Sequence, residues 1–164
     1  MKKAVKEYLG GCRIIQDTRE QQPFTFNREV VVRKLDVGDY SIIGPDGRDF
    51  SQHDICIERK DDDLWGSCFQ DHDRFRKELI RARDRLMFFC LVVEKPLASF
   101  LDSGMSNAEY ILQIATMLNV WAIKYNLHLR FCNNKDAAAR VTEEFLLKYV
   151  EHFLRDSKKE VTVI

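Results

Sequence analysis

The stretch Ile55-Cys56-Ile57-Glu58-Arg59-Lys60 has the pattern of a strand whose last residues are charged. Alternate side chains of a strand lie on the same face, so Glu58 and Lys60 are predicted to point together while Ile55 and Ile57 enter a core. A carboxylate and an ammonium group at a strand end, with a second carboxylate nearby, suit metal-assisted hydrolysis. A solvated strand end would present the same residues.

The segment Gly38-Asp39-Tyr40 supplies the second carboxylate. A strand is predicted over 39–43, and the Gly-Pro-Asp-Gly turn that follows it favours a return of the chain as strand 55–60. Antiparallel pairing of the two strands would bring Asp39 close to Glu58. Gly38 is expected to permit a positive φ or a close backbone approach just before Asp39.

The remaining pattern predicts an α/β fold, a sandwich around a mixed central sheet flanked by helices. A chain of 164 residues suits one domain. We expect an N-terminal arm at 1–11, one folded domain at 12–155 and a flexible tail at 156–164. Predicted strands lie at 12–16, 30–35, 39–43, 55–60, 88–93 and 127–131, and predicted helices at 74–86, 107–125 and 136–154.

Composition is that of a folded domain, with 45% apolar and 32% charged residues. The net charge is zero, so no global basic field indicates a nucleic-acid partner. The five cysteines are scattered without a Cys-x-x-Cys spacing, which favours buried thiols in a reducing compartment over disulfides or a zinc site. The sequence shows no signal peptide and no membrane-spanning run, and we expect a soluble intracellular protein.

Phosphodiester hydrolysis needs a cation on the phosphate and a nucleophilic water. Mg²⁺ prefers one or two carboxylates together with waters and substrate oxygens, and Asp39 and Glu58 would supply that pair. Lys60 could orient or activate the water, and the backbone carbonyl of Arg59 could complete the metal shell. Taken as spacing alone this pattern is weak, because exposed charges at a strand end match it equally well.

Three motifs in a fixed order give the pattern more weight, each at the end of a predicted strand. The series closely resembles the nuclease domain of the XPF-type structure-specific endonucleases, members of the restriction-endonuclease-like PD-(D/E)XK superfamily, over about residues 12–154. The motifs are Asp17-Thr18-Arg19-Glu20-Gln21, Gly38-Asp39-Tyr40-Ser41-Ile42 and Ile57-Glu58-Arg59-Lys60, followed by Asp63-Leu64 and Arg74-Phe75-Arg76-Lys77-Glu78-Leu79.

The resemblance implies a DNA endonuclease that depends on Mg²⁺ or Mn²⁺ and acts on structured DNA such as a flap, fork or junction. In the family an aspartate follows Glu-Arg-Lys after three residues, whereas Leu64 holds that position here and Asp63 comes one residue early. The role of Asp63 therefore stays open. The implied catalytic residues are Lys60, Glu58, Asp39, Asp17, Glu20 and Arg19, and the implied metal ligands are Asp39, Glu58 and the backbone carbonyl of Arg59.

Plainer interpretations remain for the supporting residues. Asp17 could cap the turn that follows it, and Arg19 with Glu20 could form a solvated ion pair of little energetic value. The acidic run Asp61–Asp63 could open a helix, because acidic side chains suit a helix N-terminus.

The segment 74–85 carries six basic residues against two acidic ones, so charge is locally segregated as phosphate binding requires. We expect DNA contacts from Arg74, Arg76, Lys77 and Arg81. The alternative is a solvated helix face in which Arg74 pairs with Glu78. Trp65 and Phe69 could stack on bases, although core packing would also explain them.

The helix predicted at 107–125, opened by a capping box at 106–109, is apolar over more than one stripe. Since the resembled family pairs through its C-terminal region, a homodimer is expected. The family's helix-hairpin-helix module is expected to be missing, because few residues follow the last predicted helix. The competing functional classes are a non-catalytic DNA-binding or scaffold subunit and a metal hydrolase acting on a substrate other than DNA.

Overall fold

A six-stranded mixed sheet in the order β2-β1-β3-β4-β5-β6 forms the centre of the molecule. The structure is a computed structural model that describes residues 3–64, 66–99 and 108–160. β1 pairs antiparallel with β3 and β3 with β4, while the β1–β2, β4–β5 and β5–β6 pairs are parallel. The strands are β1 Arg13–Gln16, β2 Val30–Val32, β3 Tyr40–Ile43, β4 Ile55–Lys60, β5 Phe88–Val93 and β6 Leu127–Phe131.

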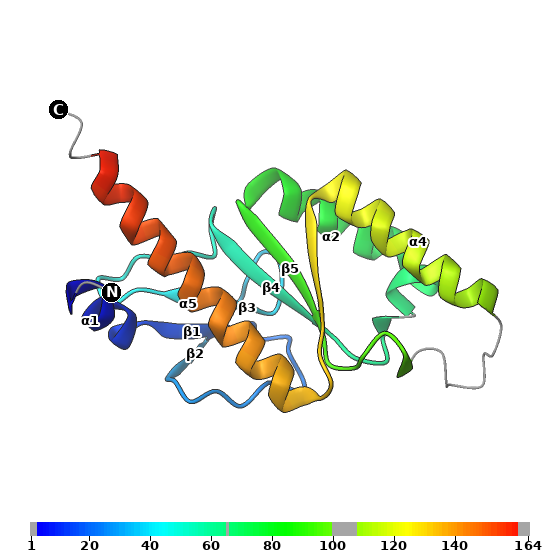
Figure 1. The fold of residues 1–164 in the computed structure, drawn as a ribbon, viewed down its shortest axis with the longest axis horizontal. Coiled ribbons are helices and arrows are strands. Elements are labelled where there is room, and N and C mark those ends of the chain that lie inside the picture. The colour runs from blue at the N-terminus through cyan, green and yellow to red at the C-terminus, as the bar shows by residue number, and fades with distance from the viewer. Residues whose placement is uncertain (1–2, 65, 100–107, 161–164) are drawn as a thin grey trace.

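Helices cover both faces of this sheet (Figure 1). α5 (Lys135–Glu160) packs on one face with α1 (Lys3–Gly11) beside it, while α2 (His72–Arg85) and α4 (Ala108–Tyr125) cover the other. A short π-helical turn, η1 (Gly66–Gln70), precedes α2. The prediction of a mixed sheet flanked by helices is therefore confirmed.

The alternation predicted for β4 is present. Ile55 and Ile57 belong to the apolar cluster under α5, and Cys56 belongs to the cluster under α2 and α4. Glu58 and Lys60 follow Cys56 at intervals of two, so they lie on the face that α2 covers. β5 is buried on both faces from Phe89 to Val93, as expected for a short apolar strand with parallel neighbours.

Because of this topology, the ends of four strands lie side by side at one edge of the sheet. β1, β4 and β5 end at this edge, and β3, which runs antiparallel to β1 and β4, begins there. The residues just beyond these strand ends are Asp17, Asp39 and Glu94. Segments separated by about twenty residues or more in sequence therefore meet, as the sequence motifs predicted.

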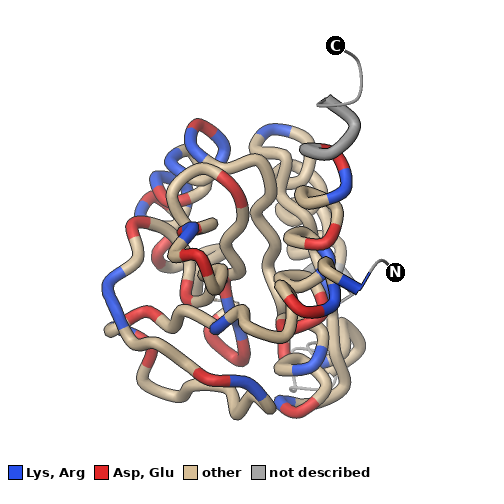
Figure 2. Tube along the Cα trace, turned by 90° about the vertical axis from the view of Figure 1, so that its left-hand side faces the viewer, with Lys and Arg blue, Asp and Glu red and all other residues tan. Residues whose placement is uncertain are grey.

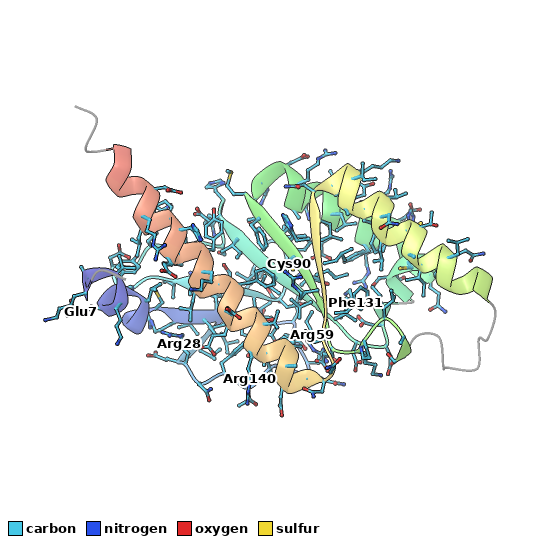
Figure 3. The ribbon with its side chains drawn as sticks, in the orientation of Figure 1. Glu7, Arg28, Arg59, Cys90, Phe131 and Arg140 are labelled. Carbon is cyan, nitrogen blue, oxygen red and sulfur yellow. The ribbon has the colours of Figure 1, made fainter. Side chains whose placement is uncertain are left out.

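The N-terminal arm predicted at 1–11 is helical, because residues 3–11 form α1. Val5 on this helix is buried, and the Arg28 guanidinium joins α1 to α5 by donating to the Leu9 carbonyl and to the Glu143 carboxylate (Figure 3). Tertiary contacts stabilise so short a helix: it packs against α5, and the Tyr8 hydroxyl donates to the Asp46 carboxylate at 2.8 Å, neither of which local sequence reveals.

Two other boundaries differ from expectation. α5 continues to Glu160, six residues beyond the predicted end at 154, so the expected tail at 156–164 is helical over its first part. α2 starts at His72, two residues before the predicted start at 74. Asp61–Asp63 precedes a separate helical turn: Leu64 is helical, the Ser67 N–H donates to the Asp63 carbonyl at 3.0 Å, and η1 follows at Gly66. The predicted capping residues Ser106 and Asn107 lie outside the described residues, as does Trp65.

All five cysteines are buried and unpaired, which confirms the expectation of core thiols rather than disulfides. Among residues 3–64, 66–99 and 108–160, no helix combines the length and the apolar character needed to cross a membrane.

Candidate active site

Asp39 makes two hydrogen bonds to the backbone of β4, one through its own N–H and one through its carboxylate. Its N–H donates to the Ile57 carbonyl at 2.9 Å, and its carboxylate accepts the Arg59 N–H at 2.8 Å. Gly38 makes this close approach possible, since its φ is +74° and an added Cβ would lie 3.0 Å from the Ile57 carbonyl oxygen. The expected positive φ at Gly38 and the expected proximity of Asp39 to Glu58 are both confirmed.

Glu58 and Lys60 form a buried ion pair on the α2 side of the sheet. The Lys60 Nζ lies 2.7 Å from Glu58 Oε1 and 5.0 Å from the centre of the Phe75 ring of α2. Asp63 approaches the same ammonium group at 3.4 Å from its exposed position. The second oxygen of Glu58, Oε2, is buried and has no hydrogen-bond partner in the described part of the chain.

The electrostatics of this cluster favour the uptake of positive charge. Burial and the charge of Asp39 hold the pKa of Glu58 well above its ordinary value. Burial raises the pKa of Asp39 to about 6, against the lowering effect of the Arg59 N–H bond. Burial acts to lower the pKa of Lys60, but the charges of Glu58, Asp63 and Asp39 together with the hydrogen bond to Glu58 outweigh it and raise that pKa, so Lys60 stays protonated.

The donor set fits a small divalent cation. Among the described side chains, no three His, Cys, Asp or Glu residues converge as a ready metal cluster. Mg²⁺, however, takes one or two carboxylates and keeps several waters, and Asp39 with the unpartnered oxygen of Glu58 provides that pair. Because the N–H and C=O of one strand residue point to the same side, the Arg59 carbonyl also faces the Asp39 side.

Asp17 lies at the same edge but is fully engaged in holding its own loop. Its buried carboxylate accepts the Arg19 N–H and Nε–H, both at 2.7 Å, and the Leu35 N–H at 2.5 Å. Burial acts to raise the pKa of Asp17, but these bonds lower it below its ordinary value. The contacts of Asp17 therefore agree with the interpretation that it caps the following turn. Arg19, from the same loop, lies near enough to Asp39 for their charges to interact.

Glu20 and Arg59 meet on the opposite face of the sheet from Glu58. The Arg59 guanidinium lies 3.5 Å from Glu20 and 2.5 Å from Glu94, at the end of β4 (Figure 3). Glu20 thus pairs with Arg59, although its charge still raises the pKa of Asp39. Sequence reasoning missed Glu94, whose signal was its place directly after the apolar run of β5.

Glu78 is the second residue that sequence reasoning missed. Its carboxylate accepts the Gly38 N–H at 3.4 Å, beside Asp39, whereas Arg74, its expected partner, pairs with Asp71 at 3.5 Å. The available signal was the position of Glu78 directly before the buried Leu79, which places it toward the inner side of an amphipathic helix.

The predicted DNA-contact residues separate onto different sides of α2. Arg74 and Arg81 share a stripe with Glu78 because they are four and three residues from it, and exposed Lys77 lies next to that stripe. Arg76 belongs to the other side with Arg83, whose guanidinium lies 6.0 Å from the Tyr125 ring of α4. Over the described chain, acidic and basic residues are interspersed (Figure 2).

The chain thus carries two carboxylates and a lysine at adjoining strand ends of a mixed α/β sheet. A model of the ERCC4 domain matches residues 16–145, so the chain belongs to the ERCC4 domain family. No curated protein sequence matches the chain.

Two solved structures share the fold. XPF from Aeropyrum pernix is 19% identical with a TM-score of 0.64, covering 82% of this chain and 59% of that chain. XPF from Aeropyrum pernix in complex with DNA is 20% identical with a TM-score of 0.63, covering 83% of this chain and 63% of that chain. The chain thus spans about three fifths of the length of these structures.

In cation-free protein we expect Asp39→Asn to stabilise the fold at alkaline pH by on the order of 2 kcal/mol. The unfolded chain loses the Asp39 proton near 3.8 and the folded chain loses it at about 6, so ionisation costs folding free energy above that range. The gain from asparagine is therefore full above about pH 6 and disappears below about pH 4.

Urea unfolding in a chelating buffer across this pH range measures the effect. Asp84→Asn is the matched control, because Asp84 is exposed on α2 and pairs with Arg83 at 2.8 Å. An Asp39→Asn protein that is less stable than wild type at pH 8 would contradict the assignment.

Proposed function

We propose that this protein is an endodeoxyribonuclease that depends on Mg²⁺ or Mn²⁺ and hydrolyses phosphodiester bonds in structured DNA. The observation that carries the proposal is the buried, unpartnered Glu58 oxygen beside Asp39, with the protonated Lys60 at 2.7 Å from the other oxygen. Membership of the ERCC4 domain family supports it, as does the solved structure of an XPF of the same fold in complex with DNA.

Asp39, Glu58 and the Arg59 carbonyl would hold the cation. When bound, a divalent cation polarises a phosphate oxygen and lowers the pKa of a bound water. Lys60 has donors beyond the one that Glu58 accepts, so it can orient a water or neutralise charge on a phosphate oxygen. Since the carboxylates of Glu58, Asp63 and Asp39 together raise the pKa of Lys60, orientation and charge stabilisation suit this lysine better than proton abstraction.

The DNA backbone would pass the strand ends in contact with Arg74, Lys77 and Arg81. They lie on or beside the stripe of α2 that contains Glu78, whose carboxylate touches Gly38 at the site. Side chains on this stripe can therefore reach phosphates next to the scissile one. The choice of a flap, fork or junction rests on the family resemblance alone.

A homodimer is the proposed assembly. α4 presents Leu112 and Ile123 with 67% and 84% of their surface exposed, although Ile114, Leu118 and Trp121 pack into the core. Exposed apolar side chains on an otherwise core-forming helix favour a protein interface. A second copy would also help a chain of zero net charge to hold DNA, because two linked sites bind one duplex more tightly than either does alone.

We expect Glu58→Gln and Lys60→Ala each to reduce cleavage at least about 100-fold while leaving the protein folded, because each removes charge at the reacting phosphate. The measurement uses labelled duplex, single strand, splayed arm, 3′ flap and junction with Mg²⁺ or Mn²⁺, and a chelator should abolish cutting. Glu144→Gln on the exposed side of α5 is the matched control.

Wild-type cleavage by the Glu58→Gln protein would refute this chemistry. Binding of the branched substrates without any cleavage by wild type would instead identify a non-catalytic DNA-binding subunit.

We expect Arg81→Ala to weaken DNA binding several-fold and to make affinity less dependent on salt. The slope of log affinity against log salt concentration should become shallower by about 0.9 for a single phosphate that is no longer neutralised. Arg76→Ala, on the other side of α2, should change neither quantity appreciably. Fluorescence anisotropy over a KCl series, in the Glu58→Gln background to prevent cutting, measures both. Equal losses for the two variants would show that the stripe does not define the DNA path.

Sedimentation velocity at micromolar concentration is expected to show a dimer that the double variant Leu112→Glu, Ile123→Glu converts to monomer. Met87→Glu is the control, because Met87 is 74% exposed but lies between α2 and β5. A stable wild-type monomer at this concentration would eliminate the homodimer.

A further inference from the structure

Glu78 approaches the strand-end carboxylates from the helix that covers them. Phe75, Leu79 and Ala82 bury the inner side of α2 against the sheet, which fixes the height and rotation of the helix. The half-buried Glu78 lies at the border of this inner side, and its carboxylate accepts the Gly38 N–H at 3.4 Å. The residue is therefore held next to Asp39 by packing of the whole helix.

The carboxylate of Glu78 interacts electrostatically with both proposed cation ligands, Asp39 and Glu58. Its charge contributes to raising the pKa of Asp39 and the pKa of Glu58. No Lys or Arg in the described ranges forms an ion pair with Glu78, because Arg74 pairs with Asp71 and Arg85 with Asp36. Three carboxylates thus lie near one another, and the positive charges that act on them within the protein come from Lys60 and from Arg19, whose charge interacts with Glu78 and Asp39.

The unpartnered oxygen of Glu58 gives independent evidence for a missing ligand in this pocket. Glu58 is almost fully buried, and its Oε2 finds no donor in the part of the chain that the structure describes. Such an atom is costly unless something positive binds to it.

Direct coordination by all three carboxylates does not agree with the geometry, since they do not converge as a metal cluster within the described residues. A role through water does agree, because Mg²⁺ keeps several of its waters in protein sites. Carboxylates that bind such waters change cation affinity about 10–100-fold without touching the ion.

We propose that Glu78 is a third carboxylate of the cation site, which binds the water shell of a divalent cation held by Asp39 and Glu58. This inference rests on the proposed function, because it concerns the same site. The same stripe of α2 would then present a negative side chain to the cation and the positive Arg74 and Arg81 to the flanking phosphates.

Mn²⁺ binding to the DNA-free protein tests the proposal, measured by the electron paramagnetic resonance signal of free Mn²⁺. Glu78→Gln keeps an oxygen for the Gly38 N–H but removes the charge, and Glu78→Ala removes both. We expect both variants to bind Mn²⁺ about tenfold more weakly than wild type. Asp84→Asn removes a charge from the same helix outside the site and should bind as wild type does.

Wild-type Mn²⁺ affinity in Glu78→Gln, with weakening only in Glu78→Ala, would show that Glu78 merely clamps Gly38 and would overturn the proposal. Wild-type affinity in both variants would overturn it as well. Glu58→Gln separates this failure from a failure of the proposed function. If Glu58→Gln loses Mn²⁺ binding and Glu78→Gln does not, only the role of Glu78 is refuted. If wild type binds no Mn²⁺, or Glu58→Gln binds it normally, both proposals fail.

Discussion

The hydrogen bonds between Asp39 and β4 are the constraint on which the site depends. The Ile57 carbonyl and the Arg59 N–H fix Asp39 at the end of the strand that carries Glu58 and Lys60. Gly38 allows this approach, since its positive φ and missing Cβ let the chain pass against the Ile57 carbonyl. Two carboxylates are thereby held together in a poorly solvated place, where both resist ionisation.

Such an arrangement costs folding free energy, and the surrounding structure offsets it. The apolar cluster under α5 anchors β4 through Ile55 and Ile57 on the face opposite Glu58. On that same opposite face, Arg59 is held between Glu20 and Glu94, which secures the end of the strand. Neither set of contacts involves the side chains of Glu58 or Lys60, so each can stabilise the end of β4 without neutralising Glu58.

α2 closes the pocket from the other face and contributes charges of both signs. Its apolar side sets its position, and the Phe75 ring lies under the Lys60 ammonium group. Its border residues then present Glu78 inward, while Arg74 and Arg81 lie one turn to either side of it. The basic sequence of α2 therefore presents three different sides: Glu78 toward the proposed cation site, Arg74 and Arg81 toward the proposed path of the phosphates, and Arg83 toward α4.

The sequence by itself determined the features that depend on local pattern: the alternation along Ile55–Lys60, the joint orientation of Glu58 and Lys60, the positive φ of Gly38 and the mixed α/β architecture. Only the tertiary structure decided which charged groups meet. Glu94 reaches Arg59 because β4 and β5 run parallel, and Glu78 reaches Gly38 because α2 packs over that edge. α1 packs against α5, far from it in sequence. A strand or a turn follows from neighbours in sequence, whereas the partner of a carboxylate follows from long-range packing that no local pattern encodes.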